Sequence, residues 1–370
     1  MLKKSSKEVA TSLQGRLDRL TPLSATCCIY RVPQKLRKVN MEAYTPRVVS
    51  IGPLHHGEEH LIAMEEHKLR YLQNFLHRTR KTLEECRINM SSKEFVEMIL
   101  VDGCFIIEVI LGFQNWNRHT IKPDDRIFNK PWLIFDVRRD MTLLENQLPF
   151  FLLLSLYSLR APPGPLPEYQ NDYAHYSFLL LSANCFIYLP LLPWLTKPSE
   201  GASGHPLGSK EKPLLDIDYR DGVLEIPKLI LADACESLFR NLIAFEQCHY
   251  REDTYITDYI YLMDHLINTT KDVDILVNKG IIDNWLGDNV AVTDLFNNLL
   301  INATLWGRNF YFAGIFEGLN AYCDVPWHSW KATLRHDYFS SPWRGASTSA
   351  AVILLLLTLI QTIFSGMSAK

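Results

Sequence analysis

The sequence lacks the short motifs that mark the common enzyme classes. It has no phosphate-binding P-loop, no GxSxG nucleophile turn, no GxGxxG dinucleotide fingerprint, no CxxC pair and no protein-kinase signature. Such motifs place a nucleophile, a phosphate or a cofactor on a defined turn, so their absence argues against the enzymes that depend on them. An enzyme with dispersed catalytic residues is not excluded. The sequence gives no reason to expect a cofactor.

The chain also lacks an excess of charge and a secretory signal. Its net charge is −3, so no global basic field favours a nucleic-acid partner. Residues 1–23 form a separate N-terminal segment whose first part is basic but has no apolar stretch behind it, which does not fit a signal peptide. Val9, Leu13, Leu17 and Leu20 recur at helical spacing and predict a short amphipathic helix.

The remaining composition is that of a folded protein. Apolar residues make up 47% and charged residues 21% of a chain of 370 residues, which is long enough to bury a sizeable core. Eight cysteines are scattered along it. Adjacent Cys27 and Cys28 suit neither a mutual disulfide nor zinc-ligand spacing, and Cys104 sits in an apolar run as a small core residue. We therefore expect a reducing environment for most of the chain.

The C-terminal tail contains a long run without charge. No charged residue occurs from 345 to 369, and Ala346 to Met367 is long and apolar enough to cross a bilayer as one helix. Trp327, Trp330 and Trp343 precede it, where amphipathic rings favour the lipid headgroup layer. The sequence predicts a single-pass membrane anchor over 345–370, with membrane lipid as its partner.

Flanking charges predict the orientation of this anchor. Lys331, Arg335 and Arg344 precede the span and only Lys370 follows it, so the bulk of the chain is expected in the cytosol. An extracellular domain is the alternative, because the chain carries N-x-S/T sequons at Asn89, Asn268 and Asn302.

Periodicity predicts a mainly α fold with a small β-hairpin and short strands. We expect a single helical domain over 24–344, interrupted by a Pro-rich linker near 161–168 and a flexible linker near 197–213. Residues 27–60, rich in Pro and Gly, favour loops and short strands. Helices are expected at 61–79, from the Ser91–Glu94 capping box to about 111, after Asp233, across 255–279 with Gly280 as C-cap, and at 289–303 and 310–322.

The segment LLDIDYRDGVLEIP, residues 214–227, has the pattern of a hairpin. Asp221 and Gly222 form the turn signal, and a two-residue turn sets Tyr219 opposite Leu224. The same register sets Asp218 opposite Glu225, which is unfavourable unless the two carboxylates are solvated.

The cluster LHHGEEH, residues 54–60, is the weak metal candidate of the chain. His55, His56 and His60 could ligate a metal, but the spacing is not HExxH and Gly57 favours a turn over one helical face. The other reading is a solvated loop whose acids cap a helix.

Three acids in the next apolar block could supply paired carboxylates. For Asp136 and Asp140 the structural reading is stronger: Asp140 caps a helix, and Asp136 pairs with Arg138 or Arg139. Glu145 lies in an apolar block and needs a partner if it is buried, for which Asn146, Gln147 or an arginine would serve. We expect no catalytic residue among them.

Several long motifs resemble the plant family called domain of unknown function 247. They are CCIYRVPQKLRKVN, AYTPRVVSIGPLHHG, MEEHKLRYLQNFL, VDGCFIIEV, DMTLLENQLPFF, LFRNLIAFEQCHY and the C-terminal anchor. The resemblance runs from about Ser24 to the end of the chain. It implies a mainly helical domain before a membrane helix, with no catalytic residue to carry over. Some grass members are linked to self-incompatibility, which implies a recognition role in those members.

One departure from the family pattern lies before Leu214. Members usually carry a further helix and strand there, where this chain has only the linker GASGHPLGSK.

Three hypotheses follow from the sequence. The first is a non-catalytic membrane protein for recognition, signalling or scaffolding, with a protein or peptide partner. The second is a membrane-tethered enzyme using the loop of His55, His56 and His60, and the third is a soluble protein whose tail docks in a groove.

Overall fold

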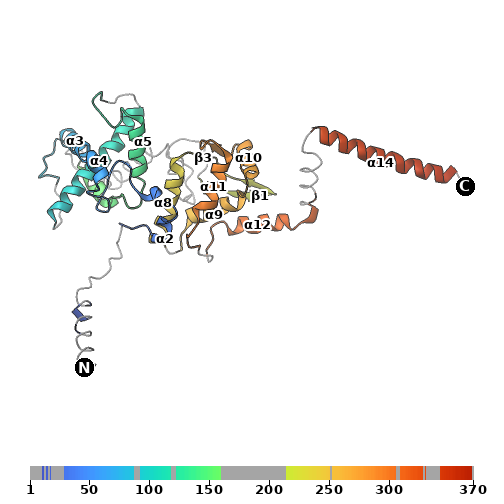
Figure 1. Cartoon of the computed structure of the whole chain (residues 1–370), viewed down its shortest axis with the longest axis horizontal. Coiled ribbons are helices and arrows are strands. Elements are labelled where there is room, and N and C mark those ends of the chain that lie inside the picture. The colour runs from blue at the N-terminus through green and yellow to red at the C-terminus, as the bar shows by residue number, and fades with distance from the viewer. Residues whose placement is uncertain are drawn as a thin grey trace, which may run out of the picture. The chain divides into compact units, whose positions relative to one another are not determined.

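A computed structural model of the protein describes residues 11, 14–15, 17, 29–86, 92–117, 122–159, 214–250, 252–305, 309–327, 330 and 342–368 (Figure 1). The chain divides into two compact units. The first takes its residues from 1–189, 233–251 and 301–303, and the second from 190–232, 252–300 and 304–370. The predictions for the linkers near 161–168 and 197–213 lie outside the described residues, and the single domain over 24–344 stays a prediction.

The first unit is built from helices. Its elements are α2 (Gln34–Arg37), η1 (Glu42–Tyr44), η2 (Glu59–Leu61), α3 (Ile62–Thr79), α4 (Lys93–Asn117), α5 (Pro131–Asp140), α6 (Phe150–Ser158) and α8 (Ala234–His249). Helix α4 is the central element, as its apolar sequence predicts. Its core-facing side chains Ile99, Phe105 and Ile107 are fully buried and belong to the same apolar cluster as Phe75 of α3.

Local signals explain where these helices begin. The Ser92 hydroxyl accepts a hydrogen bond of 3.4 Å from the Phe95 amide at the start of α4. The capping side chain is therefore one residue after the predicted Ser91, which lies outside the described residues. Pro149 immediately precedes α6, because proline fits a helix start but not a helix interior.

The second unit combines helices with two small sheets. Its elements are β1 (Asp218–Arg220), β2 (Val223–Glu225), β3 (Leu229–Leu231), α9 (Tyr255–Leu266), α10 (Thr270–Asn278), β4 (Ile282–Asn284), α11 (Asn289–Leu299), α12 (Ala313–Cys323) and α14 (Pro342–Ser368). The structure confirms the mainly α fold class with few short strands.

The predicted hairpin is present in the predicted register. Strands β1 and β2 are antiparallel, with Tyr219 opposite Leu224 and Asp218 opposite Glu225. Asp221 and Gly222 both have positive φ, as a tight hairpin turn requires. The second sheet was not predicted: β3 pairs in parallel with β4, so Leu229 lies opposite Ile282.

One expectation about local structure is wrong. Residues 29–60 form no strand in the part the structure describes, and short helical turns stand there instead. The helical pattern across 255–279 is two helices, since Thr269 and Asp272 form a capping box that starts α10. Gly280 ends α10 with a φ of 72°, as expected of a C-cap glycine.

Helix α14 is the one helix among the described residues that is long and apolar enough to cross a membrane. The qualifying window is Ala346–Ile363, and none of it is buried. It lies within the predicted segment Ala346 to Met367.

Candidate functional site

Asp136 and Asp140, two of the acids considered in the sequence, contact the segment 47–52. Asp140, the last residue of α5, is fully buried. Its carboxylate accepts hydrogen bonds from the backbone N–H groups of Arg47, Val48 and Val49, at 2.7 to 3.1 Å. The guanidinium of Arg139 lies 2.9 Å from the same carboxylate. One carboxylate therefore satisfies three consecutive donors that a partner strand would otherwise take.

The rest of this segment is held in the same way. The Ile51 amide donates to Asn146 Oδ1 at 2.6 Å, and the Gly52 amide donates to Asp102 Oδ2 at 2.8 Å. Asp102 in turn pairs with Lys68 at 2.6 Å, and both side chains are fully buried. Side chains from α4, from α5 and from the loop after α5 thus replace sheet hydrogen bonds along residues 47–52, which is why the β-branched run there does not form a strand.

The predicted roles of Asp136 and Asp140 are therefore wrong. Asp140 ends α5 instead of capping a helix start, and its partners are backbone donors about ninety residues earlier in the chain. Asp136 lies 3.3 Å from the guanidinium of Arg47, not beside Arg138 or Arg139. Sequence spacing suggested ion pairs between neighbouring residues. In the folded chain, the arginine that pairs with Asp136 comes from another segment.

Of the partners expected for a buried Glu145, the structure shows an arginine and not Asn146 or Gln147. Arg37 of α2 donates to its carboxylate at 2.5 Å, and the Val32 amide donates at 2.6 Å. Burial alone would raise the pKa of Glu145, but the nearby His55 and the hydrogen bonds from Arg37 and Val32 outweigh burial and lower the pKa to about 2. Glu145 is thus an ionised structural acceptor.

His55 is buried between two carboxylates. Its Nδ1 lies 2.7 Å from Glu58, and its Nε2 lies 3.6 Å from Glu145. The longer separation exceeds a hydrogen bond and is an ion-pair contact. Burial lowers the pKa of His55, but the close contacts with the carboxylates of Glu145 and Glu58 outweigh burial, so the pKa lies above its ordinary value.

The other two histidines of the loop point to different surroundings. His56 is exposed, whereas His60 Nε2 lies 3.2 Å from the Pro46 carbonyl oxygen. His60 Nδ1 is also 3.7 Å from Glu58. Within the ranges that the structure describes, no group of three or more His, Cys, Asp or Glu side chains is arranged to hold a metal. The structure thus brings His55 and His60 to one carboxylate, with His56 apart from them.

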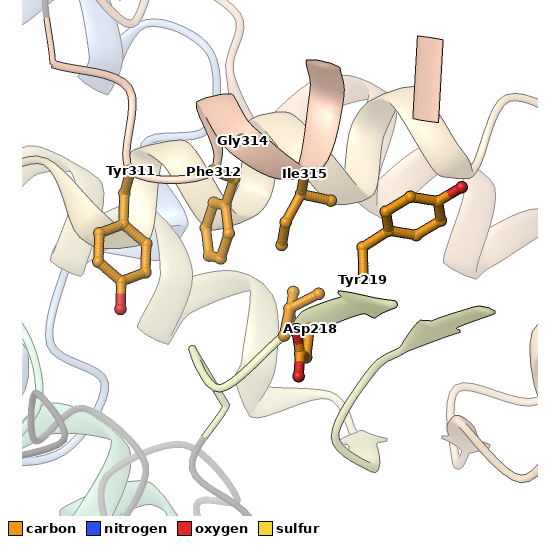
Figure 2. Close-up of a pocket in the computed structure, with 7 residues that line it drawn as sticks. Asp218, Tyr219, Tyr311, Phe312, Gly314 and Ile315 are labelled. Atoms are coloured by element: carbon orange, nitrogen blue, oxygen red, sulfur yellow. The ribbon is translucent and has the colours of Figure 1, made fainter. Parts of the chain in front are cut away.

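A cavity in the second unit was not found by sequence reasoning. It has a volume of about 430 Å³ and lies between β1 and the start of α12. Figure 2 shows Tyr311, Phe312 and Ile315 on one side of it, and Asp218 and Tyr219 on the other. The remaining lining residues are Ile217 and Gly314.

The walls of this cavity are held by polar contacts. Asp258 of α9 accepts a hydrogen bond of 2.8 Å from the Tyr311 amide, which fixes the chain entering α12. Asp218 lies 2.6 Å from the Arg220 guanidinium. The cavity therefore combines aromatic and aliphatic side chains with polar lining atoms, among them the Asp218 carboxylate. No sequence signal linked residues 217–219 to 311–315, because these are about ninety positions apart.

The predicted interfacial tryptophans are all exposed. Trp327 is 65%, Trp330 is 68% and Trp343 is 86% exposed. A large ring with one polar N–H is costly to leave in water, and it is favoured at a membrane interface.

Comparisons with known proteins give matches along most of the chain. A family model with the description "Plant protein of unknown function", DUF247, matches residues 29–182 and 204–357. The UPF0481 protein At3g47200 of Arabidopsis thaliana is 30% identical over 410 residues, which cover 91% of this chain and 86% of the relative. A putative UPF0481 protein of the same plant, At3g02645, is 26% identical over 179 residues, covering 46% of this chain and 34% of the relative. No solved structure matches.

Proposed function

This chain belongs to the plant protein family DUF247, and we propose that it is a single-pass membrane protein that recognises a protein or peptide partner without catalysis. The main support for the proposal is the apolar, exposed helix α14. Its window Ala346–Ile363 has no charged residue and no buried residue. An apolar surface of that length is unstable in water and stable in hydrocarbon, where a helix satisfies its own backbone hydrogen bonds.

The contacts of the first unit support a role without turnover. Asp140, Glu145 and His55 are buried and engaged with backbone donors, an arginine or other carboxylates. A general base must reach a substrate proton, and these groups face the interior of their own unit. These contacts give the three residues a structural role.

The cavity between β1 and α12 supports recognition. It is open to the surface of its unit and is bordered by the half-exposed Tyr311. Tyrosine contributes a large contact area with little loss of conformational entropy, which favours it in binding surfaces. We propose that a side chain of the partner enters this cavity.

Membrane extraction tests the anchor. In plant membranes, the full chain should remain in the pellet after an alkaline carbonate wash. Leu355→Arg with Leu356→Arg should move it to the supernatant, since arginine near the centre of a span costs about 2.5–3.5 kcal/mol per residue. The matched Leu355→Ala, Leu356→Ala variant should remain in the pellet. Release of the unmodified chain would contradict the anchor and favour a tail docked on a protein.

Topology is tested separately, with Asn268 as the reporter. This sequon residue is exposed, so an oligosaccharyltransferase would reach it on the lumenal side. We propose that the bulk of the chain is cytosolic, and expect no glycosylation and digestion by protease added outside sealed vesicles. Glycosylation that is lost in Asn268→Gln, together with protection from protease, would place the domain on the extracellular side.

Recognition is tested by filling the cavity. A Cβ atom on Gly314 would meet no atom within 4 Å, so Gly314→Leu enters open space at the cavity wall. Proximity labelling in plant membranes should identify partners of the unmodified chain, and Gly314→Leu should lose at least one of them while its melting temperature is kept. An unchanged set of partners would contradict a role for this cavity.

A further inference from the structure

Helix α14 has two chemically different faces. Successive residues of a helix are rotated by about 100°, so Ser347, Ala351, Leu354, Thr358 and Gln361 fall on one side. The opposite side carries only large aliphatic residues between positions 352 and 363: Val352, Ile353, Leu356, Leu359, Ile360 and Ile363. A helix that met only lipid would need no such difference between its faces.

The polar residues of the first face differ in how they are satisfied. The Thr358 hydroxyl donates to the Leu354 carbonyl oxygen at 2.7 Å, and the Thr362 hydroxyl donates to the Thr358 carbonyl oxygen at 2.8 Å. The side chain of Gln361 is exposed, and nothing in the described part of the chain donates to its amide or accepts from it. Gln361 therefore has two donors and one acceptor still to satisfy.

The position of Gln361 makes this amide costly in a bilayer. It lies six residues before Met367, or about 9 Å along the axis at about 1.5 Å per residue. In a hydrocarbon core about 30 Å thick, the amide is then well inside the layer, where neither water nor headgroups reach it. An amide with no partner in hydrocarbon is strongly disfavoured.

We propose that α14 self-associates in the membrane as a parallel pair, with Gln361 of two copies joined by reciprocal amide hydrogen bonds. The proposal rests on the proposed membrane anchor. A second copy inserted in the same orientation carries its Gln361 at the same depth, and an amide is self-complementary because it holds both a donor and an acceptor. Two-fold symmetry then satisfies both copies at once.

The rest of the face allows the close approach that this contact needs. Ser347 and Ala351 lie on the same side as Gln361, towards the N-terminal half of the span. Small side chains let two helix backbones come together, and hydrogen bonds between side chains then add to the van der Waals contact. The aliphatic face remains turned to lipid.

Energy transfer between labelled copies tests the pair. Full-length chains fused at the N-terminus to donor or acceptor fluorophores are expressed together in plant cells, and transfer is measured in isolated membranes over a range of expression levels. Gln361→Leu should weaken self-association at least about threefold, as expected for loss of one or more hydrogen bonds between helices. Leu356→Ala, on the opposite face, is the matched control and should leave transfer unchanged. Gln361→Asn should restore it in part.

The outcomes separate the pair from the anchor. Carbonate extraction is run on the same membranes, and a chain that is released there contradicts the proposed anchor itself. A chain that resists extraction but shows equal transfer with Gln361 and with Gln361→Leu overturns the pairing alone. Loss of transfer in Leu356→Ala as well as in Gln361→Leu would also overturn it, because the contact would not be confined to one face.

Discussion

Asp140 shows how much a single buried carboxylate decides in the first unit. It holds the backbone donors of Arg47, Val48 and Val49 and pairs with Arg139. The sequence indicated that Asp140 has a structural role, but not which donors it takes, because they lie about ninety positions away. The partners of Asp140 could not be predicted because they are far from it in sequence, although the chemistry of a buried carboxylate was clear.

Removing this carboxylate should be strongly destabilising. Asp140→Ala leaves three backbone N–H groups, of which that of Val49 is buried, and the buried Arg139 charge without their acceptor, so we expect the free energy of unfolding to fall by about 3–5 kcal/mol. Asp136→Ala, in the same helix, breaks an exposed pair with Arg47 and should cost at most about 1 kcal/mol. Urea unfolding of the full chain in detergent, followed by circular dichroism, measures both. Equal costs would contradict the assigned role of Asp140.

His55 should make stability depend on pH. Its pKa is raised in the folded protein, so its protonated form is favoured there over the unfolded chain. The resulting stabilisation is fully present below the unfolded value of about 6.5 and is lost as the pH rises through the folded pKa. The difference in unfolding free energy between the unmodified chain and His55→Gln should therefore be larger at about pH 5.5 than at about pH 8.5.

The partner of His55 provides the control for this effect. In a Glu145→Gln background, one of the two carboxylates that favour the protonated ring is gone. The pH-dependent part of the His55→Gln effect should then shrink, as a double-mutant cycle measures. If the pH-dependent part of the His55→Gln effect stays the same size, Glu145 does not set the charge of His55.

At the scale of elements, two glycines of α12 should respond in opposite ways. A Cβ atom on Gly318 would stand 2.7 Å from Tyr219 Cδ1 of β1, whereas one on Gly314 meets open space. Both changes to alanine gain similar helix propensity, so their difference isolates the clash. We expect Gly318→Ala to be less stable than Gly314→Ala by about 1–3 kcal/mol in urea unfolding. Equal stabilities would mean that α12 does not pack closely on the hairpin.

The hairpin and the second sheet show which elements the sequence could predict. Asp221 and Gly222 select a two-residue turn, and that turn alone fixes the pairing of Tyr219 with Leu224. The pairing of β3 with β4 depends on α9 and α10 being placed between them, so no local signal marks Leu229 as the partner of Ile282. A parallel strand of three residues is too short to be identified from the pattern of hydrophobic residues.

At the scale of the whole molecule, the metal-dependent alternative has a direct test. His55 and His60 both approach Glu58, but their nitrogens already contact carboxylate or carbonyl oxygens. We expect the purified full chain to contain no stoichiometric metal and to melt at the same temperature with and without a chelator. Stoichiometric metal that is lost in His55→Ala would contradict the non-catalytic proposal and favour the enzyme hypothesis.

The sequence by itself determined the mainly helical class, the hairpin register and the apolar length of α14, because period, turn residues and hydropathy act over a few neighbouring positions. It also indicated that a buried Glu145 needs a partner, for which Asn146, Gln147 or an arginine would serve. Only the tertiary structure decided that the partner is Arg37, that Asp140 replaces a partner strand for residues 47–49, and that a cavity lies between β1 and α12. Each of these joins residues distant in sequence, and burial in a shared core is what brings them together.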